Sequence, residues 1–132
     1  MGTNFYLYVD VCECCGRPDQ QVHIGKRSMG WTFGLQGFAG QWDFSGIFAK
    51  FLEENKITSI KSWATWKKIF KKMPKNWYIV DEYGKREDIK EFIKEVEDSY
   101  KDKKRKNHSK EYYDEKTYLD DKGYSISEHY FS

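Results

Sequence analysis

The first apolar positions of the chain alternate with tyrosines, which predicts a β-strand. Between residues 5 and 11, phenylalanine, leucine and valine fall on one side of an extended chain, and tyrosines fall on the other. The same period of two recurs more briefly over 22–24, 31–35 and 77–81. Branched and aromatic residues are typical of strands, so each of these segments is predicted to be one. Trp31 and Phe33 are expected in the core beside Phe5 and Leu7.

Three further segments repeat their apolar residues every three or four positions, which predicts amphipathic helices. The first spans 45–55. The second begins near Ser59 and stops before Pro74, because proline cannot continue a helix. The third opens at residue 87 or 88, and its apolar stripe ends at Tyr100.

The remaining C-terminal residues predict a linker and a hairpin. Residues 101–110 contain no apolar side chain, so they are predicted to form a solvated basic linker. Within 111–132, two short extended runs flank a turn-forming segment at 120–123, as in a β-hairpin.

These elements predict one domain over 1–132 with four parts. The first strands and the cysteine turn occupy 1–36, a body of helices and a strand occupies 45–100, and the linker and hairpin follow. The predicted fold class is α+β: an antiparallel sheet of four to five strands, two to three packed helices and an N-terminal zinc-knuckle-like turn.

Composition changes this picture in two respects. Aromatic residues make up 18% of the 132 residues and hydrophobic residues 39%, so the core is predicted to consist of a few large rings. The net charge of +2 hides local imbalance, since residues 50–76 hold eight lysines and two glutamates.

No apolar run approaches the ~20 residues of a membrane helix, and the N-terminus lacks a signal peptide. We expect a cytoplasmic protein without a membrane partner.

All three cysteines lie close together, and two of them have the spacing of a metal-binding turn. Cys12 and Cys15 form C-x-x-C, and Gly16 permits the positive φ that such a turn needs. His23 is the predicted third ligand. Thiolate and imidazole ligands favour zinc, and clustered thiols of this kind are typical of a reducing compartment. We expect Cys14 to point away from the metal.

The fourth ligand decides the character of this predicted zinc site. His129 or His108 would complete a closed, structural site, as would Asp10 or Asp19. A water molecule in that position would leave the site open and potentially catalytic. The structural site is favoured because no evident general base accompanies the ligands.

Lysines provide the second candidate site. Lys61, Lys68, Lys71 and Lys72 share the polar side of the second predicted helix, where they would bind a nucleic acid or an acidic protein surface. An ordinary solvated face is the alternative. Lys26 and Arg27 lie in Gly-Lys-Arg-Ser, but Gln20 replaces the upstream glycine of a P-loop, so nucleotide binding is excluded and an anion-binding turn is expected at most.

Several segments together resemble a family of small, largely uncharacterised proteins of bacteriophages and prophages. They are MGTNFYL (1–7), CECCGR (12–17), HIGK (23–26), GWTF (30–33), DEYG (81–84) and FS (131–132). That family usually has Cys and His where this chain has Thr32 and Gln36, so a metal ligand at either position would be absent here. The resemblance implies a phage origin and action in the host cytoplasm, and it implies no reaction.

Three hypotheses of function follow. The first is a phage-borne, zinc-stabilised protein that binds a host protein or protein–nucleic-acid complex, and so inhibits a host defence system such as a CRISPR effector. The second is a small metal-dependent hydrolase or nuclease with an open site at Cys12, Cys15 and His23. The third is a nucleic-acid-binding module.

Overall fold

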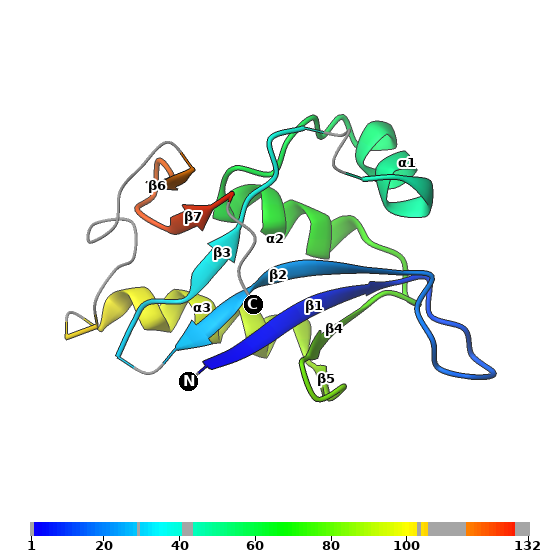
Figure 1. Cartoon of the computed structure of the whole chain (residues 1–132), viewed down its shortest axis with the longest axis horizontal. Helices are drawn as coiled ribbons and strands as arrows, with labels where there is room; N and C mark the ends of the chain where they lie inside the picture. Colours follow the sequence, from blue (N-terminus) through cyan, green and yellow to red (C-terminus); the bar gives the residue numbers. More distant parts are fainter. Residues whose placement is uncertain (1, 29, 41–43, 103, 106–115, 129–132) are drawn as a thin grey trace.

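A computed structural model describes residues 2–28, 30–40, 44–102, 104–105 and 116–128 of the chain. Within these residues the chain forms three helices and a seven-stranded sheet of order β5-β4-β1-β2-β3-β7-β6 (Figure 1). The elements are β1 (Gly2–Val9), β2 (Gln20–Ser28), β3 (Gly34–Gln36), α1 (Gly46–Glu54), α2 (Trp63–Lys72), β4 (Tyr78–Asp81), β5 (Arg86–Glu87), α3 (Ile89–Lys101), β6 (Thr117–Leu119) and β7 (Ser125–Ser127).

The α+β class, the helices and the terminal hairpin are confirmed, but the predicted sheet is wrong in size and in direction. Seven strands replace the predicted four to five, and β3 pairs with β7 in parallel, so the sheet is mixed. The two-residue strand β5 is too short to leave a periodic signal. Joining the β6–β7 hairpin to the sheet depends on contacts between residues far apart in the sequence, which local patterns do not reveal.

Strand β1 is an interior strand of the sheet and is antiparallel to both β2 and β4. Its core side carries Phe5, Leu7 and Val9, each fully buried as the alternation predicts. A bulge interrupts the β1–β2 register between Phe5 and Tyr6. There, a Cβ on Gly25 would lie 2.2 Å from the Gly34 carbonyl oxygen, so a residue without a side chain is required.

Helices α2 and α3 cover the core side of the sheet, behind the strands in the view of Figure 1. Phe92 of α3 packs its ring 5.2 Å from that of Phe5 and 6.0 Å from that of Phe70 on α2. Phe33 is buried beside Phe5 as expected, at a ring distance of 5.5 Å. Trp31 was expected in the same core, and there the prediction is wrong, because its side chain is only half-buried.

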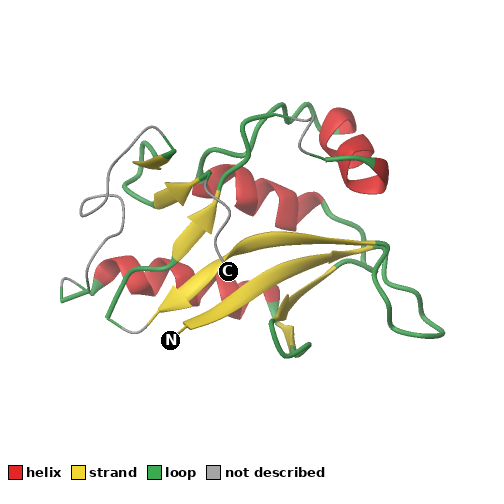
Figure 2. Cartoon of the chain, in the orientation of Figure 1, coloured by secondary structure: helices red, strands yellow, loops and turns green. Residues whose placement is uncertain are grey.

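The other side of the central strands carries a different set of side chains, mainly tyrosines and polar residues. We call it the open face and define it by the outward positions of β1, β2, β4 and β5. They are Asn4, Tyr6, Tyr8, Gln21, His23, Lys26, Tyr78, Val80 and Arg86. Figure 2 shows the long strands β1 and β2 side by side, joined at one end by the projecting loop 10–19 that holds the cysteines.

Candidate functional site

The cysteines lie in a tight turn that two backbone hydrogen bonds close, and the zinc-knuckle-like form predicted for it is only partly matched. The Gly16 N–H donates to the Cys12 carbonyl oxygen at 2.8 Å, the Cys12 N–H donates to the Arg17 carbonyl oxygen at 2.9 Å, and Gly16 adopts a φ of 70°. Backbone N–H groups of Cys15 and Cys14 donate to the Cys12 sulfur and lower the pKa of its thiol. All three cysteines are exposed. The turn therefore favours the thiolate, which is the form that binds zinc.

His23 does not lie with the cysteines. It pairs with Tyr6 in the β1–β2 register, and three residues of strand, about 10 Å, separate Tyr6 from Val9, where the cysteine loop begins. Among the described residues, no group of three or more His, Cys, Asp or Glu side chains is placed to hold a metal ion. His108 and His129 lie outside the described residues. Zinc binding thus remains a prediction. Of its predicted ligands, Cys12 and Cys15 are the two that lie together in the cysteine turn.

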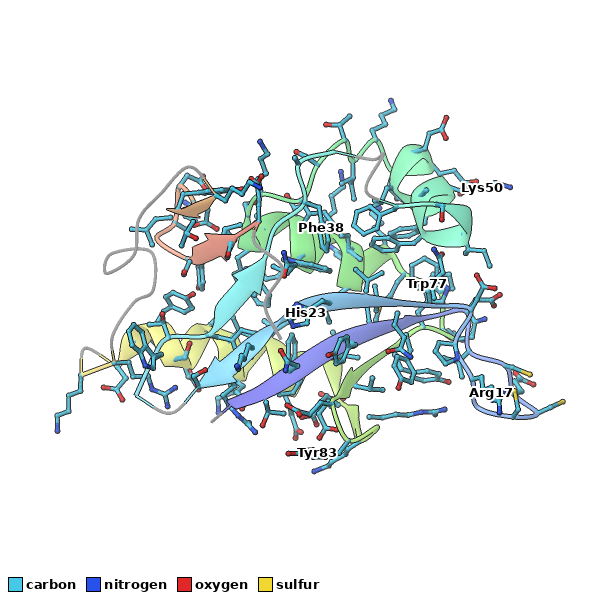
Figure 3. The ribbon with its side chains drawn as sticks, in the orientation of Figure 1. Arg17, His23, Phe38, Lys50, Trp77 and Tyr83 are labelled. Atoms are coloured by element: carbon cyan, nitrogen blue, oxygen red, sulfur yellow. The ribbon has the colours of Figure 1, made fainter. Side chains whose placement is uncertain are left out.

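The ring of His23 instead makes hydrogen bonds to two amide side chains on the open face. Its Nδ1 is 3.1 Å from Gln36 Oε1, and its Nε2 is 2.9 Å from Asn4 Oδ1. Figure 3 places His23 over the middle of β2, well away from Arg17 in the cysteine loop. No pattern in the sequence pointed to Asn4. For Gln36, the pointer was the predicted resemblance to phage proteins, which implies histidine at that position.

The Gln36 amide fixes the proton of the imidazole. Its nitrogen donates to the carbonyl oxygens of Gly37, at 3.2 Å, and Ser127, at 3.1 Å, so its oxygen must face His23 and accept from Nδ1–H. Burial lowers the pKa of His23, which favours the neutral ring. A neutral ring accepts at Nε2, so the Asn4 amide must present its nitrogen there. The orientation with Oδ1 at 2.9 Å from Nε2 is the one that a protonated His23 requires.

The lysine face of α2 is arranged as the sequence predicts. Trp63, Trp66, Ile69 and Phe70 are buried on one side of the helix, whereas Lys68, Lys71 and Lys72 are exposed, as is Lys61 just before it. Lys75, also exposed, continues this basic surface beyond the end of the helix. Lys67 differs from these, because its ammonium group lies 3.0 Å from a Glu97 carboxylate oxygen.

The predicted anion-binding pair of Lys26 and Arg27 divides between two faces of the sheet. Arg27 makes an ion pair with Glu95 of α3, and its guanidinium lies 5.5 Å from the centre of the Phe5 ring. Lys26 pairs with Asn4 in the β1–β2 register and is half-buried on the open face. Arg27 therefore serves to join α3 to the sheet, and the two cations do not form one anion site.

Comparison of the chain with protein-family models, with curated proteins and with solved structures finds no match. The resemblance to phage proteins therefore stays a prediction. Of the helices in the described segments, none combines the length and the apolar character needed to cross a lipid bilayer.

Proposed function

We propose that this chain is a phage-borne binding protein that occupies a host macromolecule through the lysine face of α2. The observation that carries the proposal is the exposure of Lys61, Lys68, Lys71 and Lys72 along a helix whose opposite side is fixed in the core. A row of ammonium groups carried on a fixed helix matches an anionic surface, either the phosphates of a protein–nucleic-acid complex or the carboxylates of a host protein.

Charge reversal on this face tests the proposal. Protein carrying Lys61, Lys68, Lys71 and Lys72 as Glu should stay folded, because exposed charges contribute little to stability. It should lose the host species that wild-type protein captures from lysate, as identified by mass spectrometry. The matched control reverses four exposed lysines elsewhere, Lys85, Lys90, Lys94 and Lys122. Equal capture by wild type and the α2 variant would reject the lysine face as the binding surface.

A host defence complex, such as a CRISPR effector, is the target we propose for such a phage-borne protein. The support is the resemblance to phage proteins together with a basic surface suited to a complex that contains nucleic acid. Expression of the chain in a host with an active CRISPR system should raise the plating efficiency of a targeted phage. The α2 charge-reversal variant should not raise it. Equal plating with and without the wild-type chain would remove this target.

We also propose that the cysteine turn holds zinc and stabilises the loop. The support is the N–H donation to Cys12 and the exposure of both spaced thiols. Protein purified without chelator should contain about one zinc per chain, as the ligand spacing implies. Cys12→Ser should lose the metal, whereas Cys14→Ser should keep it. His23→Gln should also keep it, because the structure places His23 away from the turn. Metal-free, well-folded wild-type protein would contradict the proposal.

A further inference from the structure

We propose that the open face of the sheet binds single-stranded nucleic acid, with bases stacked on its aromatic rings. The inference does not rest on the proposed function, because it concerns the side of the sheet opposite the helices. The face offers rings on three neighbouring strands, cations at its margins and hydrogen-bonding amides beside the rings.

The rings lie in two rows that cross the strands. In one row Tyr78 of β4 pairs with Tyr8 of β1, and Tyr8 pairs with Gln21 of β2. In the other row, the pairs run from Arg86 through Val80 and Tyr6 to His23. The Tyr6 and His23 rings are 5.3 Å apart. Neighbouring strands are about 4.8 Å apart, so successive rings along a row are close enough to receive successive bases.

Each of these rings is half-buried, which suits a stacking platform. Tyr6, Tyr8, His23 and Tyr78 all have intermediate exposure, so one part of each ring packs on the sheet while another part stays accessible. Packing holds the rings in place before a ligand arrives, which reduces the entropy lost on binding. Base stacking on such rings tolerates any sequence, since every base has a π-face.

The charges on the open face complement a phosphate backbone. The Arg86 guanidinium lies over one face of the Tyr78 ring, 3.8 Å from the ring centre, so at this end of the row a base would stack on the guanidinium plane that Tyr78 supports. Lys26 stands at the other margin. Glu82, which follows β4 in the same alternation as Tyr78 and Val80, borders this face and accepts from the Asn4 backbone N–H at 2.7 Å. Beyond Arg86, a hollow of about 340 Å³ continues to Lys75, and Glu13 also lines it. A strand lying across the rings would therefore meet cations along its course.

An amide group beside the rings supplies contacts to base edges. A second hollow, of about 260 Å³, adjoins His23 and is lined in part by Gln21, Phe38 and Phe44. Gln36 also lines the hollow, but its amide is held by His23, Gly37 and Ser127. The exposed Gln21 amide can form hydrogen bonds with the Watson–Crick edges of unpaired bases, which a duplex does not expose. These contacts favour a single strand over a double helix.

Fluorescence anisotropy with the full chain tests this proposal. The probes are fluorescein-labelled oligo-dT and oligo-U of about 12 nucleotides, within the span of single-strand platforms, and a duplex of the same length. Wild-type protein should bind a single strand more tightly than the duplex. Tyr8→Ala and Tyr78→Ala should each weaken binding about tenfold. Tyr83→Ala is the matched control, because Tyr83 is 80% exposed at the β4–β5 turn and away from the rows.

Two further variants separate a loss of oligonucleotide affinity from a loss of folding. Tyr8→Leu and Tyr78→Leu retain apolar bulk but remove the ring, so they should fold and still lose affinity, with thermal midpoints measured alongside. No binding to either single strand, equal loss from Tyr83→Ala, or tighter binding of the duplex would overturn the proposal. If only the α2 charge reversal abolishes oligonucleotide binding, the open face is rejected and the lysine face of the proposed function stands.

Discussion

At the scale of single residues, His23 shows that sequence spacing alone does not identify a metal ligand. The sequence places it eight positions after a C-x-x-C pair, and that distance suits a zinc ligand. The strand pairing instead carries it to Tyr6, with Asn4 and Gln36 as hydrogen-bond partners. Asn4 and Gln36 are far from His23 along the chain, so only the β1–β2 register and the place of β3 beside β2 reveal the contact.

The pH dependence of stability should report the burial of His23. Burial lowers the pKa of His23 from its ordinary value of 6.5, so the unfolded chain binds a proton more readily than the folded one. The stability that the neutral ring contributes is complete above pH 6.5 and is lost as the pH falls through the lowered pKa. Urea unfolding between pH 7.5 and pH 5 should therefore show a larger loss for wild type than for His23→Gln.

Glutamine is the appropriate replacement because its amide keeps a donor and an acceptor at this position without titrating. His108 and His129 are present in both proteins, so their effect cancels in the comparison. An identical pH dependence in the two proteins would mean that protonation of His23 does not oppose folding.

Phe33 and Trp31 show a second limit at this scale. The alternation over 31–35 predicts one strand with both rings inward, yet β3 begins only at Gly34. Side chains of α3 hold the backbone at Phe33: its N–H donates to Ser99 Oγ at 3.0 Å, and its carbonyl accepts from the Tyr100 hydroxyl. A segment held by helix side chains need not alternate, so Phe33 turns inward and Trp31 remains half-buried.

At the scale of elements, helix caps explain the boundaries that periodicity left imprecise. The second helix was predicted from Ser59, but α2 begins at Trp63, because the Ser62 side chain accepts from the Thr65 N–H at 3.2 Å. The Trp63 N–H is free to donate to Asp120 at 2.9 Å. Since Asp120 lies 57 positions away, the sequence could not show this second cap.

Replacing Ser62 with Ala should destabilise the protein by about 1 kcal/mol, the usual effect of losing a serine cap. Ser45 provides a matched control. It occupies the same N-cap position in α1 but makes no side-chain cap hydrogen bond there. Ser45→Ala should therefore change the free energy of unfolding by much less. Urea titrations of the three proteins measure both effects, and equal losses would show that the Ser62 hydroxyl does not cap α2.

At the scale of the whole molecule, the terminal hairpin completes the sheet. Leu35 of β3 pairs in parallel with Ile126 of β7, and the Gly37 N–H donates to the Ser127 carbonyl oxygen at 2.7 Å. The hairpin itself was predictable, because its turn signal is local. Its docking was not, since a parallel partner 91 positions away leaves no mark in the nearby sequence.

This docking makes a prediction about cooperativity. Ile126 is fully buried in the same cluster as Phe5, Trp66 and Phe92, so the hairpin and the N-terminal strands share one core. Ile126→Ala should lower the free energy of unfolding by about 2–5 kcal/mol, because it removes buried methyl groups and leaves a cavity. Ile47→Ala is the matched control, since Ile47 is 38% exposed on α1 and should lose far less.

Unfolding should remain a single transition in all three proteins, with coincident midpoints by tryptophan fluorescence and far-ultraviolet circular dichroism. Of the tryptophans in the described residues, Trp63 and Trp66 report on α2, Trp77 on the segment before β4 and Trp31 on the segment before β3. Circular dichroism reports on the whole backbone. A hairpin that packed weakly would separate first, and Ile126→Ala would then split the two curves while leaving the main midpoint unchanged. Coincident curves displaced together to lower urea would instead establish that residues 116–128 belong to the same cooperative unit as β1 and β2.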